Sequence, residues 1–275
     1  MRMLLFGLQY GPYLPIVALF ISSTSLVFTV HVSRSEKLFP PEIRYPPLSL
    51  AGIYEKNIVH CYLIFAVVFV MISLQLLFIE NLHWLLLSHT SALRPVGARE
   101  GRAILQTAHN YVRVGFLGLA LTGLIPLQGW GGGATTVHSL SSLLFFFGSL
   151  AHGWMSLSAW AHPSTAAHPL SRKNSPFLWW CKGFLLFSGF LSFIPAQVLH
   201  PGGTPLHPHP LGPELADVER AGFGQWWFVG SLMLYYASMG FDFWVLRGAK
   251  EGEVLLKEYQ DNIKRGGEVE LDKEE

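Results

Sequence analysis

Charged residues are scarce in this chain. Asp, Glu, Lys and Arg together make up 13% of the 275 residues, whereas hydrophobic residues make up 51%. Soluble domains usually contain about 25% charged residues. The shortage therefore argues against an ordinary soluble domain and predicts a polytopic membrane protein. The formal net charge is only +1, which leaves no basic excess to neutralise phosphates, so we expect no nucleic-acid partner.

Cysteines and catalytic motifs are scarce as well. Cys61 and Cys181 are expected at opposite faces of the membrane and should not form a disulfide with each other. The sequence contains no recognisable nucleophile motif, and no set of Cys, His and carboxylate residues has the spacing of a tetrahedral metal site. We therefore expect a non-catalytic protein with no catalytic residues, no metal ligands and no cofactor.

Long apolar stretches are abundant. An α-helix needs about 20 mostly apolar residues to cross a bilayer. The stretches that qualify are residues 13–33, 58–79, 110–128, 138–161, 177–199 and 225–246. The predicted fold is an all-α bundle of six transmembrane helices over residues 1–246, followed by a charged tail at 247–275.

Basic residues predict the orientation of this bundle, because Lys and Arg accumulate in cytoplasmic flanks. With both termini in the cytoplasm, most basic residues lie on that side. The cytoplasmic set is Arg2, Arg94, Arg99, Arg102, Arg113, Arg172, Lys173, Lys182 and the basic residues from Arg247 to Lys273. The opposite set is Arg34, Lys37, Arg44, Lys56 and Arg220. We therefore expect both termini in the cytoplasm.

Small residues within the predicted spans indicate where helices approach closely, because small side chains let two backbones come together. These residues are Gly115, Gly118, Gly123, Gly148 and Ser149. We expect them to serve helix packing.

Ionisable residues inside a membrane are costly and are functional candidates by default. Arg113 and Asp242 are predicted at similar depths near the inner face, which suggests an intramembrane ion pair. A structural clamp between the third and sixth spans is the simpler interpretation of that pair. Glu80 is expected at the inner interface, without a special role.

Histidine spacing raises a further hypothesis. His138 and His152 are 14 residues apart in the fourth span, about 21 Å along one helix face. Two stacked haems could use such a pair, with His60 facing His138 and His109 facing His152. Polar packing and interfacial placement are the simpler explanation, and we favour it over a di-haem electron carrier.

The segment "RYPPLSLAGIYEKN", residues 44–57, lies between the first two predicted spans. Its adjacent prolines, Pro46 and Pro47, restrict the backbone and remove two hydrogen-bond donors. Gly52 then permits a turn before the next span. This segment is expected on the outer face.

The order of these features resembles the FRAG/DRAM/SFK family of six-span eukaryotic membrane proteins. The resemblance rests on "PPLSLAG" in the first outer loop, "VGFLGLALTGLIPLQ" in the third span and "VHSLSSLLFFFGSLAHGW" in the fourth. It implies that the loop folds back as an outer cap, with His138 close by. The cap residues are Pro46, Pro47, Ser49, Gly52 and Glu55. They could line a lipid headgroup site, although a rigid loop that locks the bundle is the simpler alternative.

The resemblance also implies functions. A non-catalytic role in membrane lipid organisation, signalling or autophagy-type processes, or in scaffolding partners, is the first expectation. It predicts a closed apolar bundle without a convergent acid–base group. An accessory subunit of a large membrane complex and a GPI-anchor lipid remodelling factor are the alternatives. The implied partners are membrane lipids and other membrane proteins, in lysosomal or other endomembranes or the plasma membrane.

Overall fold

The computed structural model describes residues 2–37, 39–41, 43–51, 58–89, 99–125, 133–197, 213–249 and 257. The regular structure of these residues is entirely helical, without a strand, which confirms the predicted all-α class. The helices are α1 (Arg2–Tyr10), α2 (Leu14–Ser35), α3 (Leu48–Ala51), α4 (Ile58–His89), α5 (Arg99–Leu124), α6 (Gly133–Ala161), a 3₁₀ turn η3 (Pro163–Thr165), α7 (Pro176–Gln197), α8 (Pro213–Ala237) and α9 (Met239–Gly248).

Every predicted span overlaps a long helix, and α8 and α9 share the sixth. In the described ranges, four stretches have the length and composition to cross a membrane: Leu14–Ser35, Leu63–Ser88, Thr136–Ala161 and Val218–Gly248. Two helices differ from their predicted limits. α4 continues past residue 79 to His89, and α5 begins at Arg99 rather than at residue 110. Both extensions carry polar residues that pack inside the bundle.

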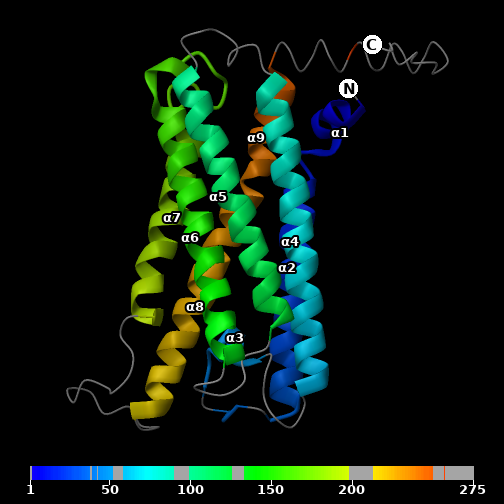
Figure 1. Cartoon of the computed structure of the whole chain (residues 1–275), viewed down its shortest axis with the longest axis vertical. Helices are drawn as coiled ribbons and strands as arrows, with labels where there is room; N and C mark the ends of the chain where they lie inside the picture. The colour runs from blue at the N-terminus through cyan, green and yellow to red at the C-terminus, as the bar shows by residue number, and fades with distance from the viewer. Residues whose placement is uncertain are drawn as a thin grey trace, which may run out of the picture.

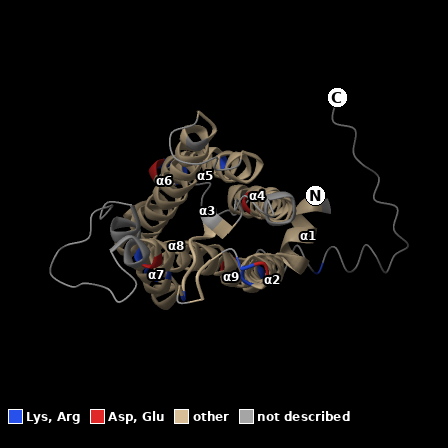
Figure 2. Cartoon of the chain, turned by 90° about the horizontal axis from the view of Figure 1, so that it is seen from below, with Lys and Arg blue, Asp and Glu red and all other residues tan. Residues whose placement is uncertain are grey.

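The long helices run side by side and form one elongated bundle (Figure 1). Seen along its axis, the helices form a ring in which α5 packs on α6, α7 packs on α8, and α2 and α9 lie together (Figure 2). We call the end that carries α1 and the α6–α7 connection the α1 end. The opposite end, where α3 lies, is the α3 end.

Glycines bring α5 and α6 into backbone contact, as the sequence predicted. A Cβ atom on Gly148 would lie 2.8 Å from the Tyr111 carbonyl oxygen and 2.8 Å from the Gly115 Cα. A Cβ atom on Gly118 would lie 2.6 Å from the Ser141 carbonyl oxygen. No side chain fits at such distances, so these positions require glycine for close packing.

The α3 end is closed by the connection between α2 and α4. α3 lies in the middle of the ring of helices (Figure 2), and Leu48 and Ala51 are buried. Ser33 Oγ, at the end of α2, donates a hydrogen bond of 2.9 Å to the Ala51 carbonyl. The short helix is thereby tied to α2 and covers this end of the core.

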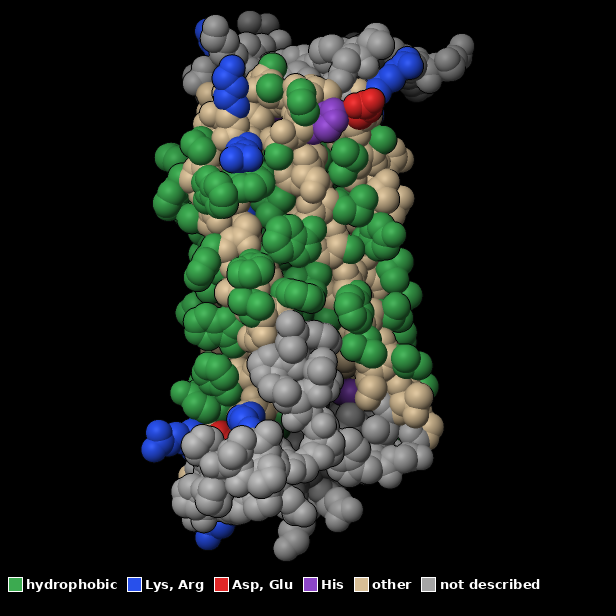
Figure 3. Space-filling view, turned by 90° about the vertical axis from the view of Figure 1, so that its left-hand side faces the viewer, with side chains coloured by type: hydrophobic (Ala, Val, Ile, Leu, Met, Phe, Trp, Pro, Cys, Tyr) green, Lys and Arg blue, Asp and Glu red, His purple; other side chains and the backbone are tan. Residues whose placement is uncertain are grey.

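The outer surface is apolar along the length of the bundle. Hydrophobic side chains cover the middle of the face in Figure 3, and charged side chains gather toward its two ends. Large exposed side chains such as Phe20, Leu117 and Phe184 are at least 60% exposed. A belt of this kind is expected where a protein contacts lipid.

Candidate functional site

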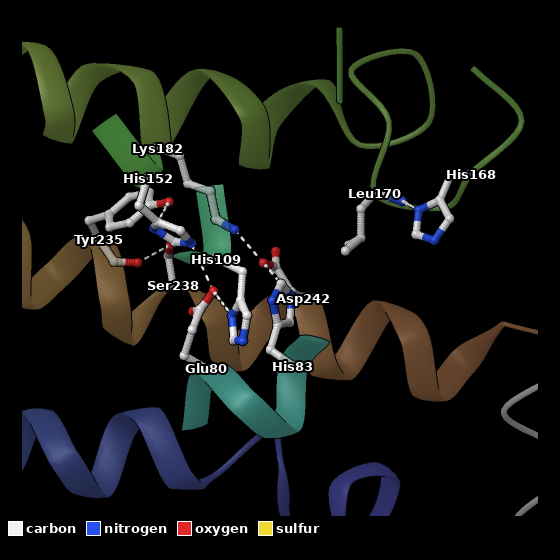
Figure 4. Close-up of polar contacts among 10 residues, drawn as sticks. All are labelled: Glu80, His83, His109, His152, His168, Leu170, Lys182, Tyr235, Ser238 and Asp242. Carbon is white, nitrogen blue, oxygen red and sulfur yellow. Dashed lines mark hydrogen bonds and ion pairs between the residues drawn. The ribbon is translucent and has the colours of Figure 1, made fainter. Parts of the chain in front are cut away.

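A group of ionisable side chains lies inside the bundle, toward the α1 end (Figure 4). We call it the acid–base network. Its members are Glu80 and His83 of α4, His109 of α5, His152 of α6, Lys182 of α7, Tyr235 of α8 and Asp242 of α9. No member is more than 7% exposed. Charged groups are rarely buried to this extent unless they are paired, so their contacts matter.

Helix geometry explains why these residues meet. Glu80 and His83 are three residues apart on α4 and therefore share one helix face. Tyr235 lies near the end of α8 and Asp242 in the first turn of α9, and both are buried in the same interior. The network thus draws one or two side chains from each of several helices.

Glu80 is the centre of one half of the network. Its Oε1 atom accepts a hydrogen bond from His152 Nε2 at 2.9 Å and faces His109 Nδ1 at 3.4 Å. His152 Nδ1 lies 3.3 Å from the Tyr235 hydroxyl. Trp84 stacks on the His109 ring with centroids 5.4 Å apart. One carboxylate oxygen therefore links two histidines, and one of these histidines is bonded to a tyrosine.

Asp242 is the centre of the other half. Its Oδ2 atom forms a buried ion pair with Lys182 Nζ and lies 3.2 Å from His83 Nε2. Phe243 packs edge-on against the His83 ring at a centroid distance of 5.4 Å. This half joins α4, α7 and α9.

A helix interruption at Ser238 lies between Tyr235 and Asp242, the residues that α8 and α9 contribute to the two halves. The Ser238 amide donates to the carbonyls of both Leu234 and Tyr235, at 2.9 and 3.1 Å. The Ser238 hydroxyl also donates to Tyr235, and the Phe241 amide donates to Ser238. These tighter bonds separate α8 from α9, so Tyr235 and Asp242 lie on opposite sides of a break.

A small cavity lies between the two carboxylates. Its walls include Glu80, His83, His152, Lys182 and Asp242. The space open to the centre of a water molecule is about 20 Å³, which is enough for a water molecule in a polar site. It is far too small for a lipid headgroup.

The two carboxylates of this group have different partners. Lys182 pairs with Asp242, whereas Glu80 faces two histidines. An unpaired buried charge costs several kcal/mol, so a proton on one of these histidines would compensate the Glu80 carboxylate. His109 Nδ1 and His152 Nε2 both face Glu80 Oε1. Their other ring nitrogens are the alternative proton sites: His109 Nε2 is buried without a hydrogen-bond partner, and His152 Nδ1 faces Tyr235.

The predicted Arg113–Asp242 pair is wrong. Arg113 is exposed, and its Nη2 atom donates a hydrogen bond of 3.0 Å to Asn81 Oδ1. Asp242 instead pairs with Lys182. The sequence argument matched depths along two helices, but Arg113 lies on the outer face of α5 and Asp242 points to the interior.

Glu80 and Lys182 were missed as site residues. We expected Glu80 at the interface and counted Lys182 among the cytoplasmic flanks, but both are buried. The available signal was the continuation of apolar residues after Glu80, which keeps this residue and His83 inside a long helix. The expected bundle without a convergent acid–base group is therefore wrong in that respect.

The proposed inner haem pair is not supported by this geometry. His109 and His152 face the same Glu80 oxygen, and both His152 nitrogens already have partners. No lone pair of His152 is left for an iron. His138 donates Nδ1–H to the Ile125 carbonyl at 2.7 Å, while the His60 side chain lies outside the described parts of the chain.

The described cap residues contact α8 rather than His138. Trp226 Nε1 donates a hydrogen bond of 2.9 Å to the Pro46 carbonyl, and Pro47 is buried. A Cβ atom on Gly222 would lie 1.8 Å from the Tyr45 carbonyl, so the loop presses directly on the α8 backbone. The side chain of Ser49 and the whole of Gly52 and Glu55 lie outside the described residues.

In the described parts of the chain, no three His, Cys, Asp or Glu side chains are grouped for a metal ion. Neither a protein-family model, nor a curated protein, nor a solved structure matches this chain.

Proposed function

We propose that this chain is a six-span membrane protein with both termini in the cytoplasm. Besides the four stretches that meet the criteria for spans, α5 packs along α6, and α7 packs along α8. α5 and α7 would supply the other two spans, since each runs along a helix that meets the criteria (Figure 1). With this orientation, the α1 end faces the cytoplasm and the acid–base network lies in the inner half of the membrane.

We further propose that the network binds a proton and passes it between the Glu80 and Asp242 halves. The observation that carries this proposal is the sharing of Glu80 Oε1 by His109 and His152, at 3.4 and 2.9 Å. Two imidazoles at one carboxylate give the neutralising proton more than one place to reside. The polar cavity reaches both carboxylates, and chains of Asp, Glu and His are typical of proton relays in membranes.

The roles suggested by the family resemblance remain hypotheses about what the proton controls. Pro46 and Tyr45 are held against α8. These contacts support the interpretation that the outer loop is rigid and locks the bundle. A lipid-related or scaffolding role would then respond to protonation at the inner end. The proton-binding network itself does not depend on which partner the protein has.

Infrared spectroscopy of the protein in liposomes tests proton binding directly. The pH is changed across the range in which histidines titrate, and the carboxyl and imidazole bands are recorded. We expect paired changes in both types of band. The Glu80→Gln variant should lose the carboxyl change assigned to the shared proton.

Glu100→Gln is the matched control, because Glu100 faces His162 at 3.3 Å but is 77% exposed at its side chain. This variant should retain the coupled carboxyl and imidazole changes of the network. Carboxyl band changes that are the same in the wild type and in Glu80→Gln would contradict the proposal. The network would then have a purely structural role.

A further inference from the structure

The N-terminal helix α1 packs against the helices that carry the network. Gly7 faces α4 so closely that a Cβ atom there would lie 2.8 Å from Leu82 Cδ1 and 3.0 Å from Leu86 Cδ1. Leu82 is fully buried and directly precedes His83 in the sequence. α1 therefore covers the part of α4 from which His83 reaches the interior.

The turn after α1 presses on α9 in the same way. A Cβ atom on Gly11 would lie 2.5 Å from the Phe243 ring. A Cβ atom on Gly240 would lie 2.7 Å from the Pro12 carbonyl oxygen. Phe243 is fully buried and follows Asp242 directly. The turn thus fixes α9 immediately beside the Asp242–Lys182 pair.

The opposite face of α1 is apolar and exposed. Met3, Phe6 and Tyr10 are 49%, 39% and 46% exposed, although the residues from Met3 to Leu8 are all apolar or glycine. The Phe6 ring lies 6.2 Å from Phe78, an exposed residue of α4. The exposed face of α1 is therefore continuous with the apolar outer surface of a spanning helix.

We propose that α1 lies in the inner membrane interface, with the lipid surface as the partner of its exposed face. An interfacial helix buries its apolar side about 5–10 Å into the boundary between headgroups and acyl chains. A helix of 9 residues is too short to supply the roughly 800 Å² per partner of a stable protein interface. Continuity with the Phe78 surface therefore favours lipid over a second copy of the chain.

Lipid contact gives α1 a mechanical role. Held in the interface, α1 and its turn clamp α9 against α4 and keep Asp242 between Lys182 and His83. Release of α1 should loosen α9 first. This inference rests on the proposed membrane-spanning arrangement and is independent of proton binding.

Spin labelling tests the location of α1. In a background with Cys61→Ser and Cys181→Ser, nitroxide labels are placed at Phe6→Cys, at lipid-facing Phe147→Cys and at exposed Lys173→Cys, in phosphatidylcholine–phosphatidylglycerol liposomes. Relaxation by oxygen and by a water-soluble nickel chelate is then measured. We expect the Phe6 label to have the same ratio of oxygen to chelate accessibility as the Phe147 label. It should collide with the chelate several-fold less often than the Lys173 label.

The outcomes separate the two proposals. A Phe147 label as open to the chelate as the Lys173 label would contradict the membrane-spanning arrangement. If the Phe6 label is as open to the chelate as the Lys173 label while the Phe147 label is protected, the placement of α1 is overturned. Dipolar broadening between Phe6 labels would also overturn it, because a second copy would then occupy this face.

Hydrogen exchange tests the clamp. Phe6→Glu with Tyr10→Glu should draw α1 out of the interface, and amides of α9 should then exchange at least about tenfold faster, as expected for local opening. Amides around Gly115 in the α5–α6 contact are the internal control and should keep their protection. Unchanged exchange in α9, or an equal gain in all helices, would contradict a clamp specific to α9.

Discussion

Glu80 of α4 and His152 of α6 lie 2.9 Å apart, although 72 positions separate them in the chain. Their contact joins two helices that both pack on α5, inside a bundle whose outer surface is apolar. A proton added to the imidazole turns this contact from a hydrogen bond between a carboxylate and a neutral ring into a buried ion pair. The stability of the bundle and the protonation of its core are therefore linked at this point.

Removing the charge of Glu80 should destabilise the protein. In Glu80→Gln the histidines lose the carboxylate that compensates their proton, and breaking a buried pair on one side costs about 3–5 kcal/mol. Thermal unfolding in detergent measures the loss. Glu100→Gln should change the free energy of unfolding by less than about 1 kcal/mol, since exposed pairs contribute little. Equal effects of the two variants would show that burial of Glu80 is not decisive.

The Lys182–Asp242 pair should show strong coupling in a double-mutant cycle. Lys182→Met alone leaves Asp242 with an uncompensated charge and should cost about 3–5 kcal/mol. The double variant Lys182→Met with Asp242→Asn should cost clearly less than the sum of the single variants. Lys173→Met, in the exposed connection, is the control. Additive costs would mean that the pair does not act as a unit.

Close packing of α5 on α6 should make Gly148 intolerant of a side chain. Gly148→Ala forces a methyl group to within 2.8 Å of backbone atoms and should cost about 1–3 kcal/mol. Gly230→Ala in α8 meets nothing within 4 Å and should be neutral or stabilising, by up to about 1 kcal/mol. Melting temperatures of the two variants provide the comparison; a tolerated Gly148→Ala would contradict this contact.

His168 should make stability depend on pH. It is fully buried in the connection between α6 and α7, stacks on Trp160 at 4.7 Å and accepts a hydrogen bond from the Leu170 amide. Burial, with a smaller contribution from His83, lowers the pKa of His168 from 6.5 to about 4, against the opposing effect of Asp242.

Between these two values the unfolded chain binds a proton at this position and the folded chain does not. The stabilising contribution is therefore complete above about pH 6.5 and is lost as the pH falls toward about 4, by roughly 3 kcal/mol in all. Melting temperatures across this range should fall less steeply with acidification in His168→Gln than in the wild type. Identical slopes would contradict the assignment to His168.

The sequence predicted the helices well and their interior contacts poorly. Apolar runs located the long helices, and the positions of Gly115, Gly118 and Gly148 correctly indicated close packing, because both features are local. The partner of Asp242 is not a local property. It depends on the rotation of each helix about its axis, which placed Lys182 inside the bundle and Arg113 outside.

Two further elements were beyond a pattern of long apolar runs. α1 has only 9 residues, which is too short for a predicted span. The turn between α1 and α2 was not predicted, because it directly adjoins the apolar run that predicts α2. The break at Ser238 leaves the apolar pattern of the sixth span intact, because both α8 and α9 remain hydrophobic. The sequence feature that accompanies the break is Asp242, an acidic residue in the first turn of α9.

The assembly of the network from α4, α5, α6, α7, α8 and α9 constrains how the chain can change in length. One inserted residue turns the rest of a helix by about 100° and shifts it by 1.5 Å. An insertion between Tyr235 and Asp242, or between Glu80 and His83, would rotate one partner out of the interior. Insertions and deletions within these two spacings are therefore incompatible with the site, so relatives that keep it should preserve both spacings while their loops vary.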